Sequence, residues 1–171
     1  AGQERVSGTD LAEKFGIDAQ VVRSGEEIGA KRIYITNYDR LDKFDASRFA
    51  GVILDESSVI KNFTGKTTRA LIDAFAKTRF RLCCTATPAP NDHTELGTHA
   101  EFLGAMRREE MLPIWFINDT MDTGTWRIKG HARENFWSWV ASWSRCVSRP
   151  SDLGFCDDGF VLPDLTITHH E

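Results

Sequence analysis

Residues 49–56 read Phe-Ala-Gly-Val-Ile-Leu-Asp-Glu, an apolar run that ends abruptly in two acidic side chains. Its β-branched content and short length predict a strand buried in a parallel sheet, with Asp55 and Glu56 at its carboxyl end. Ligands bind at that end of the strands in open α/β sheets. The acidic pair is therefore the first candidate site, against the alternative that it is only a solvated strand end.

A second strand is predicted at 79–85, and it ends in Thr85-Ala86-Thr87-Pro88. The residues between the two strands predict a helix at 66–77, with Ala70, Leu71, Ala74 and Phe75 on one face. Parallel strands joined by a helix place their carboxyl ends on the same edge of the sheet. We therefore expect Thr85 and Thr87 beside the acidic pair, where small hydroxyl side chains would sense what is bound there.

The flanking segments extend the same alternation of helices and strands. A helix is predicted at 9–15, strands at 17–23 and 32–36, and a short helix after Asn37. Further along, Asp92 is expected to cap a helix that runs to Leu103. The expected fold class is α/β, with a mostly parallel sheet flanked by helices.

Beyond Gly104 the composition changes, so residues 1–104 are interpreted as one domain and 105–171 as a helical extension. A tryptophan-rich helix is predicted at 132–147, with Phe136, Val140, Trp143 and Val147 on one face. Such a stripe is typical of core packing. The alternative is that its aromatic rings stack on nucleic-acid bases.

The composition restricts the function. The 171 residues are 41% hydrophobic and 27% charged, and the net charge is −4. A domain that binds nucleic acid alone is usually basic, so any such contact is expected to be local. No stretch predicts a membrane span or a secretory leader, and a cytoplasmic setting is expected. The four cysteines form no CxxC pairs and are expected to be reduced, with Cys83 and Cys84 buried.

Several motifs resemble those of superfamily-two helicases and ATPases. Asp55-Glu56-Ser57-Ser58 resembles the DExx box, and Thr85-Ala86-Thr87-Pro88 resembles motif III. The Ile60-Lys61-Asn62 stretch is similar to the Swi/Snf-type branch, and Thr36-Asn37-Tyr38-Asp39 to motif Ib. Residues 126–132 and 150–154 resemble helicase-like proteins of phages and prophages, and this resemblance is less specific than that of the two central motifs.

The resemblance implies part of the first RecA-like lobe of a P-loop NTPase that acts on nucleic acid, with double-stranded DNA as the favoured partner and RNA as the open alternative. It implies Asp55 as the Mg²⁺ carboxylate, acting through water, and Glu56 as the catalytic base. It implies that Thr85 and Thr87 respond to the bound nucleotide, and that Thr36, Asn37 and Tyr38 approach the nucleic-acid backbone. The Swi/Snf branch typically has Gly-His after Asp-Glu, whereas this chain has Ser57-Ser58, so the branch and the substrate stay open.

The phosphate-binding loop is expected to be missing. Gly65-Lys66-Thr67-Thr68 is like the end of that loop, but the first glycine of the pattern falls on Ile60. A helix N-terminus is the preferred interpretation. ATP and Mg²⁺ are thus expected as cofactors of a full-length protein with a second RecA-like lobe, and this chain alone is expected to bind neither and to be inactive.

Two other functions are alternatives to an ATP-driven motor on nucleic acid. One is a non-catalytic module that binds DNA or a protein on the same scaffold. The other is a Mg²⁺-dependent nuclease, which needs more inward carboxylates than the chain offers. The oligomeric state is left open.

Overall fold

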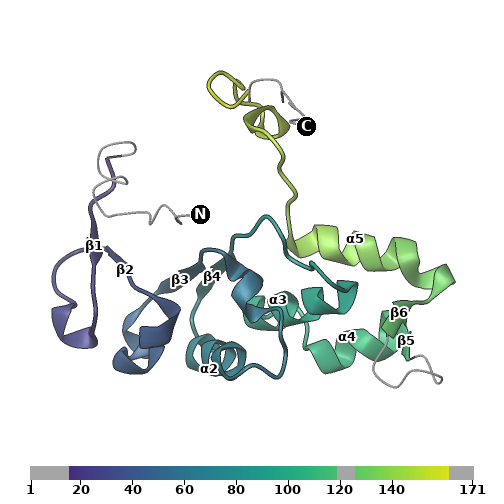
Figure 1. Cartoon of the computed structure of the whole chain (residues 1–171), viewed down its shortest axis with the longest axis horizontal. Helices are drawn as coiled ribbons and strands as arrows, with labels where there is room; N and C mark the ends of the chain where they lie inside the picture. Colours follow the sequence, from purple (N-terminus) through teal and green to yellow (C-terminus); the bar gives the residue numbers. More distant parts are fainter. Residues whose placement is uncertain (1–15, 119–125, 162–171) are drawn as a thin grey trace, which may run out of the picture. The chain divides into compact units, whose positions relative to one another are not determined.

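The computed structural model describes residues 16–118 and 126–161 (Figure 1). The strands are β1 (Ala19–Val21), β2 (Ile33–Ile35), β3 (Gly51–Leu54), β4 (Phe80–Cys83), β5 (Phe116–Asn118) and β6 (Trp126–Ile128). The α-helices are α2 (Lys66–Phe75), α3 (Leu96–Leu103), α4 (Arg108–Trp115) and α5 (Arg133–Trp143). The 3-10 helices are η1 (Gly25–Glu27), η2 (Tyr38–Lys43), η3 (Ala46–Arg48), η4 (Ser57–Ile60), η5 (His93–Glu95), η6 (Gly130–Ala132) and η7 (Pro150–Leu153). The helix predicted at 9–15 lies outside the described residues.

The described strands form three separate pairs. β1 pairs with β2 and β3 pairs with β4, both in parallel, while β5 and β6 are antiparallel. The mixed α/β class is confirmed, but the described strands do not join into one parallel sheet, because β2 and β3 are not hydrogen-bonded to each other. Within the described residues, no further strand is paired to the outer edges of any of the three pairs.

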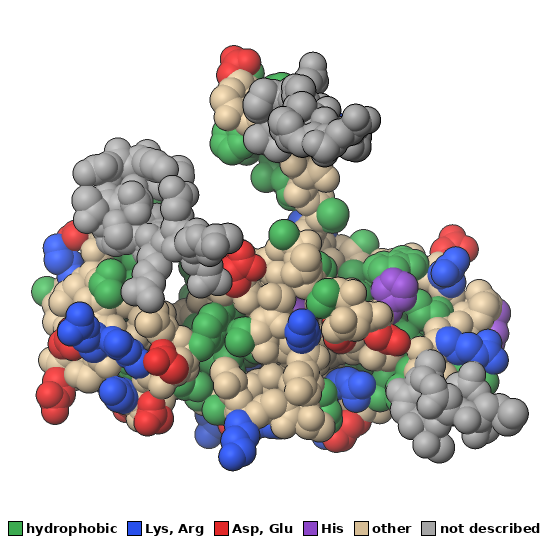
Figure 2. Space-filling view, in the orientation of Figure 1, with side chains coloured by type: hydrophobic (Ala, Val, Ile, Leu, Met, Phe, Trp, Pro, Cys, Tyr) green, Lys and Arg blue, Asp and Glu red, His purple; other side chains and the backbone are tan. Residues whose placement is uncertain are grey.

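The β3–β4 pair is covered on one face only. Leu54 is buried, whereas Ile53, Phe80 and Leu82 expose 68%, 60% and 49% of their surface. The predicted strand is present, but the prediction that it is buried in a sheet is wrong for its outer face, where Ile53 is exposed. Side chains alternate across a strand, so the helices on one side cover every second residue and leave the others open. Hydrophobic side chains accordingly reach the surface on the face shown in Figure 2.

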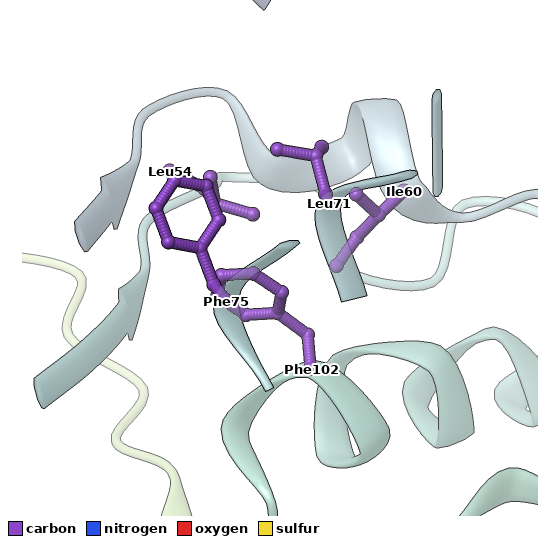
Figure 3. Packing of buried hydrophobic residues seen from close by; sticks show 5 residues of the cluster. All are labelled: Leu54, Ile60, Leu71, Phe75 and Phe102. Carbon is purple, nitrogen blue, oxygen red and sulfur yellow. The ribbon is translucent and has the colours of Figure 1, made fainter. Parts of the chain in front are cut away.

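The core lies between this pair and helices α2 and α3. It is a cluster of five buried side chains, Leu54, Ile60, Leu71, Phe75 and Phe102 (Figure 3). The helix α2 confirms the predicted helix, but a different set of its residues is buried. Leu71 and Phe75 are buried together with Thr68, while Ala70 and Ala74 are exposed. An alanine loses little by exposure, so it marks the core face of a short helix poorly.

The cap of the following helix is as predicted. The Asp92 carboxylate accepts a hydrogen bond of 2.6 Å from the Thr94 amide at the start of η5, which runs on into α3. Helix α3 then packs closely on α4, since a Cβ atom on Gly97 would lie 2.8 Å from the Met111 methyl carbon. It ends at Gly104, whose φ of +77° suits glycine.

The chain divides into two compact units, one up to Lys129 and the other from Gly130 onward. The domain boundary at 104 remains a prediction. In the second unit, α5 is shorter than the predicted helix, because Ser144 is extended and ends it. Phe136 and Val140 are buried, but Val147 lies beyond the helix and is 46% exposed. The predicted four-residue face therefore does not form in full.

The cysteines of the chain are free thiols. Cys83 is half-buried, but Cys84 is exposed, so the prediction that both are buried is wrong for Cys84. Adjacent residues of a strand point to opposite faces, and only one of these faces is covered here. In the described parts of the chain, no helix is both long and apolar enough to cross a bilayer.

Candidate functional site

The acidic pair occupies a turn that is held on both sides by the neighbouring strand. β3 and β4 run in parallel with Leu54 opposite Cys83. Beyond that register, the Cys84 amide donates to the Leu54 carbonyl and the Ser57 amide donates to the Cys84 carbonyl, both at 2.9 Å. The backbone of Cys84 thus closes the turn that contains Asp55 and Glu56, and both acidic residues are exposed.

Glu56 has an unusual backbone conformation. Its φ of 49° and ψ of 48° lie in the left-handed region, and it is the one non-glycine residue with positive φ in the described part of the chain. Its amide donates to the Asp55 carboxylate at 3.1 Å. A sharp left-handed step directs the chain from the strand into η4 and leaves the glutamate at the apex of the turn. Such outliers persist where the surrounding contacts impose them.

The two threonines lie shortly after β4, with Thr85 next to Cys84 and Thr87 two residues further on. Thr85 is half-buried and Thr87 exposed, and the Thr87 amide donates to the Thr85 hydroxyl at 3.1 Å. The parallel pairing thus brings the two predicted strand ends together. The direct link between them is the backbone of Cys84, however, and not either hydroxyl. The role of Thr85 and Thr87 in sensing nucleotide stays a prediction.

Three buried or half-buried polar side chains, Ser57, Cys83 and His99, lie next to the acidic turn, and the sequence analysis did not predict them as a cluster. Ser57 is fully buried, and its hydroxyl lies beside the Cys83 thiol. Burial raises the pKa of that thiol to about 12 and lowers the pKa of the His99 imidazole. Both groups are therefore neutral near pH 7. The exposed turn rests on an uncharged interior that packs α3 against η4.

The candidate nucleic-acid segment, Thr36 to Tyr38, follows β2 and runs into the first residue of η2. Thr36 and Asn37 are exposed, and Asn37 is the N-cap residue of η2. Tyr38 differs from them, since its hydroxyl donates to the Asp55 carbonyl at 2.5 Å. The structure thus joins one of the three candidate residues to the acidic turn. On the face shown in Figure 2, Lys and Arg side chains are interspersed with Asp and Glu.

Gly65-Lys66-Thr67-Thr68 forms the start of α2. Gly65 is the N-cap residue, Lys66 is exposed, and Thr68 is 1% exposed. A Cβ atom on Gly65 would lie 3.1 Å from the Asn62 carbonyl oxygen and 3.2 Å from the Thr68 hydroxyl oxygen. The segment follows η4 and a turn, whereas a phosphate-binding loop follows a strand. The helix N-terminus interpretation therefore agrees with the structure.

The acidic turn has the chemistry that Mg²⁺ requires. The ion prefers hard oxygen ligands and keeps several waters, so one or two carboxylates plus substrate phosphates suffice. Asp55 and Glu56 supply two exposed carboxylates on one turn. Within the described residues no cluster of three or more His, Cys, Asp or Glu side chains would hold a metal ion. The residues present thus fit a hydrated ion shared with a substrate.

No curated protein and no solved structure matches the chain. A comparison with protein families does give a match, to the SNF2-related domain over residues 3–116. The matched span is more than half of the chain and contains both strand ends, the turn at Glu56 and the Tyr38 contact. On this match, the chain belongs to the SNF2-related domain family.

Proposed function

We propose that this chain is part of the first RecA-like lobe of an ATP-dependent helicase or DNA translocase, of a kind found in phages and prophages. The observation that carries the proposal is the parallel pairing of β3 and β4. Extended through Cys84, it puts the Asp55-Glu56 turn next to Thr85. Membership of the SNF2-related family supports ATP-dependent chemistry on nucleic acid, with nucleotide and Mg²⁺ as cofactors.

Each residue of the turn has a part in the proposed reaction. Bound Mg²⁺ would neutralise charge on the nucleotide phosphates. Asp55 would hold that hydrated ion through its carboxylate. Glu56 would orient the attacking water and accept its proton. Thr85 and Thr87 would report the state of the site, and exposed Thr36 and Asn37 would contact the backbone of double-stranded DNA.

The chain by itself is proposed to be inactive. Catalysis of phosphoryl transfer depends on neutralising the developing charge, which needs a backbone cradle and a lysine on the phosphates. Neither is recognisable in this sequence. The strand edges that carry no further strand among the described residues, and the open face at Ile53, Phe80 and Leu82, support a lobe to which further elements add. The second lobe and a cytoplasmic setting belong to the same proposal.

The test is ATP hydrolysis by the full-length gene product, with and without double-stranded DNA. We expect DNA-stimulated turnover, and a loss of at least about 100-fold in Glu56→Gln, because that is what a general base contributes. Asp73→Asn, a charge-removing change at an exposed position of α2, is the matched control and should behave as wild type.

Three outcomes would contradict the proposal. Retained DNA stimulation in Glu56→Gln would remove Glu56 from catalysis. Mg²⁺-dependent turnover by the 171-residue chain alone would refute its inactivity. DNA binding by the full-length product without any hydrolysis would favour a non-catalytic binding module on this scaffold.

A further inference from the structure

Tyr38 links the candidate nucleic-acid segment to the acidic turn across 17 residues of sequence. Its ring packs against the core cluster that contains Leu54, and its hydroxyl donates to the Asp55 carbonyl at 2.5 Å. The ring is thus anchored in the core while the polar end reaches the turn. Among the described residues, the side chains that hydrogen-bond to the backbone of Asp55 or Glu56 are those of Tyr38 and of Asp55 itself.

The bonded carbonyl belongs to the peptide that orients Glu56. That peptide has the Asp55 carbonyl on one side and the Glu56 amide on the other. The carbonyl accepts from Tyr38, and the amide donates to the Asp55 carboxylate at 3.1 Å. A rotation of this peptide plane changes φ of Glu56, which lies at 49°. The Tyr38 bond therefore restrains the rotation that would move the Glu56 carboxylate.

The other end of the link is open to solvent. Tyr38 is the first residue of η2, and its neighbours Thr36 and Asn37 are exposed. Asn37 is the N-cap of η2, and its carbonyl accepts from the Arg40 amide at 3.2 Å. A ligand on Thr36 and Asn37 therefore bears on the first turn of η2, which carries Tyr38. A displacement there reaches the Asp55–Glu56 peptide through one hydrogen bond.

We propose that Tyr38 is a positioning residue, which transmits nucleic-acid binding at Thr36 and Asn37 to the orientation of Glu56. It does not itself contact the nucleic acid or the nucleotide. The proposal rests on the function proposed above, since it needs Glu56 to act in hydrolysis. It gives DNA stimulation a structural route inside the described part of the lobe.

The experiment compares Tyr38→Phe with Tyr34→Phe in the full-length gene product. Both changes remove one hydroxyl and keep the ring. Tyr34 is the other tyrosine of the chain. Its hydroxyl donates to the Gly29 carbonyl at 2.8 Å and not to the acidic turn. The quantities to measure are the ratio of DNA-stimulated to basal kcat and the DNA concentration that gives half-maximal stimulation. The ratio does not depend on the fraction of folded enzyme, so simple destabilisation would leave it unchanged.

We expect Tyr38→Phe to lower this ratio about fivefold, the equivalent of one hydrogen bond. The half-saturating DNA concentration should be unchanged, and Tyr34→Phe should keep the wild-type ratio. An unchanged ratio in Tyr38→Phe overturns the proposal, and so does an equal fall in Tyr34→Phe. A raised half-saturating DNA concentration with an unchanged ratio makes Tyr38 a nucleic-acid contact and also overturns it. If the wild-type protein shows no DNA-dependent hydrolysis, the proposed function fails as well.

Discussion

Substitution of Glu56 by glycine and by alanine tests the backbone conformation of the acidic turn. Both variants lack the carboxylate, so they differ only in the Cβ atom. A residue with a Cβ atom loses roughly 1–2 kcal/mol in the left-handed region. Glycine avoids that loss, but it lowers the free energy of unfolding by about 0.5–1 kcal/mol because it loses more conformational entropy on folding. With φ at 49° and ψ at 48°, Glu56→Gly should therefore be the more stable variant, by about 0.5–1 kcal/mol.

The control is the same pair of residues at position 74. Ala74 is exposed in the last turn of α2, where the backbone is helical. There the glycine variant should be less stable than the alanine variant by up to about 1 kcal/mol. The difference in the free energy of unfolding between the glycine and alanine variants should thus have opposite signs at positions 56 and 74. That sign does not depend on the charge lost at Glu56.

Thermal unfolding followed by far-ultraviolet circular dichroism would measure the difference. For a chain of this size, 1 kcal/mol shifts Tm by about 2–4 °C. We expect Glu56→Gly to melt above Glu56→Ala, and Ala74→Gly to melt below wild type. An alanine variant at position 56 that equals or exceeds the glycine variant would refute the reasoning, because the turn would then not impose the left-handed conformation.

Two further predictions concern the core and the thiols. Phe102→Ala should lower the free energy of unfolding by about 3–5 kcal/mol, because Phe102 is 1% exposed in the core cluster, while Leu82→Ala on the open face should cost under about 1 kcal/mol. Urea unfolding compares the two, and equal losses would mean that the face at Leu82 is covered. Iodoacetamide at pH 8 should modify exposed Cys84, Cys146 and Cys156 but spare Cys83, since burial raises the pKa of its thiol to about 12 and leaves no thiolate to react. Mass spectrometry would locate the labels, and early labelling of Cys83 would contradict the burial.

The sequence predicts what depends on local pattern. An apolar run followed by two acids, a helix and a second apolar run is enough to foresee β3, α2 and β4 and their parallel pairing. The Asp92 cap follows from the same kind of signal, because its hydrogen bond to Thr94 spans only two residues. These features arise within one strand–helix–strand unit, and local residue types determine them.

Features that depend on tertiary packing could not be read in the same way. The contact between Tyr38 and Asp55 joins two segments with no shared pattern. The buried face of α2 includes Thr68 rather than Ala70, because Thr68 shares a helix face with Leu71 and Phe75 at spacings of three and four, and tertiary packing determines which face is covered. The left-handed φ of Glu56 has no residue signal, since glycine or asparagine is the usual occupant of such a position. Each of these features lies at the candidate site or next to it.

The conformation of Glu56 is itself an argument for its role. A glycine would suit this φ better, and the exposed side chain makes no contact that stabilises the turn among the interactions described for it. The conformation is imposed from outside, by Cys84 on both flanks of the turn and by Tyr38 on the Asp55 carbonyl. Three external hydrogen bonds thus hold the backbone around Glu56, and strained conformations of this kind cluster at active sites. A left-handed residue other than glycine lowers stability, so its presence in the acidic turn supports the proposal that Glu56 acts in the reaction.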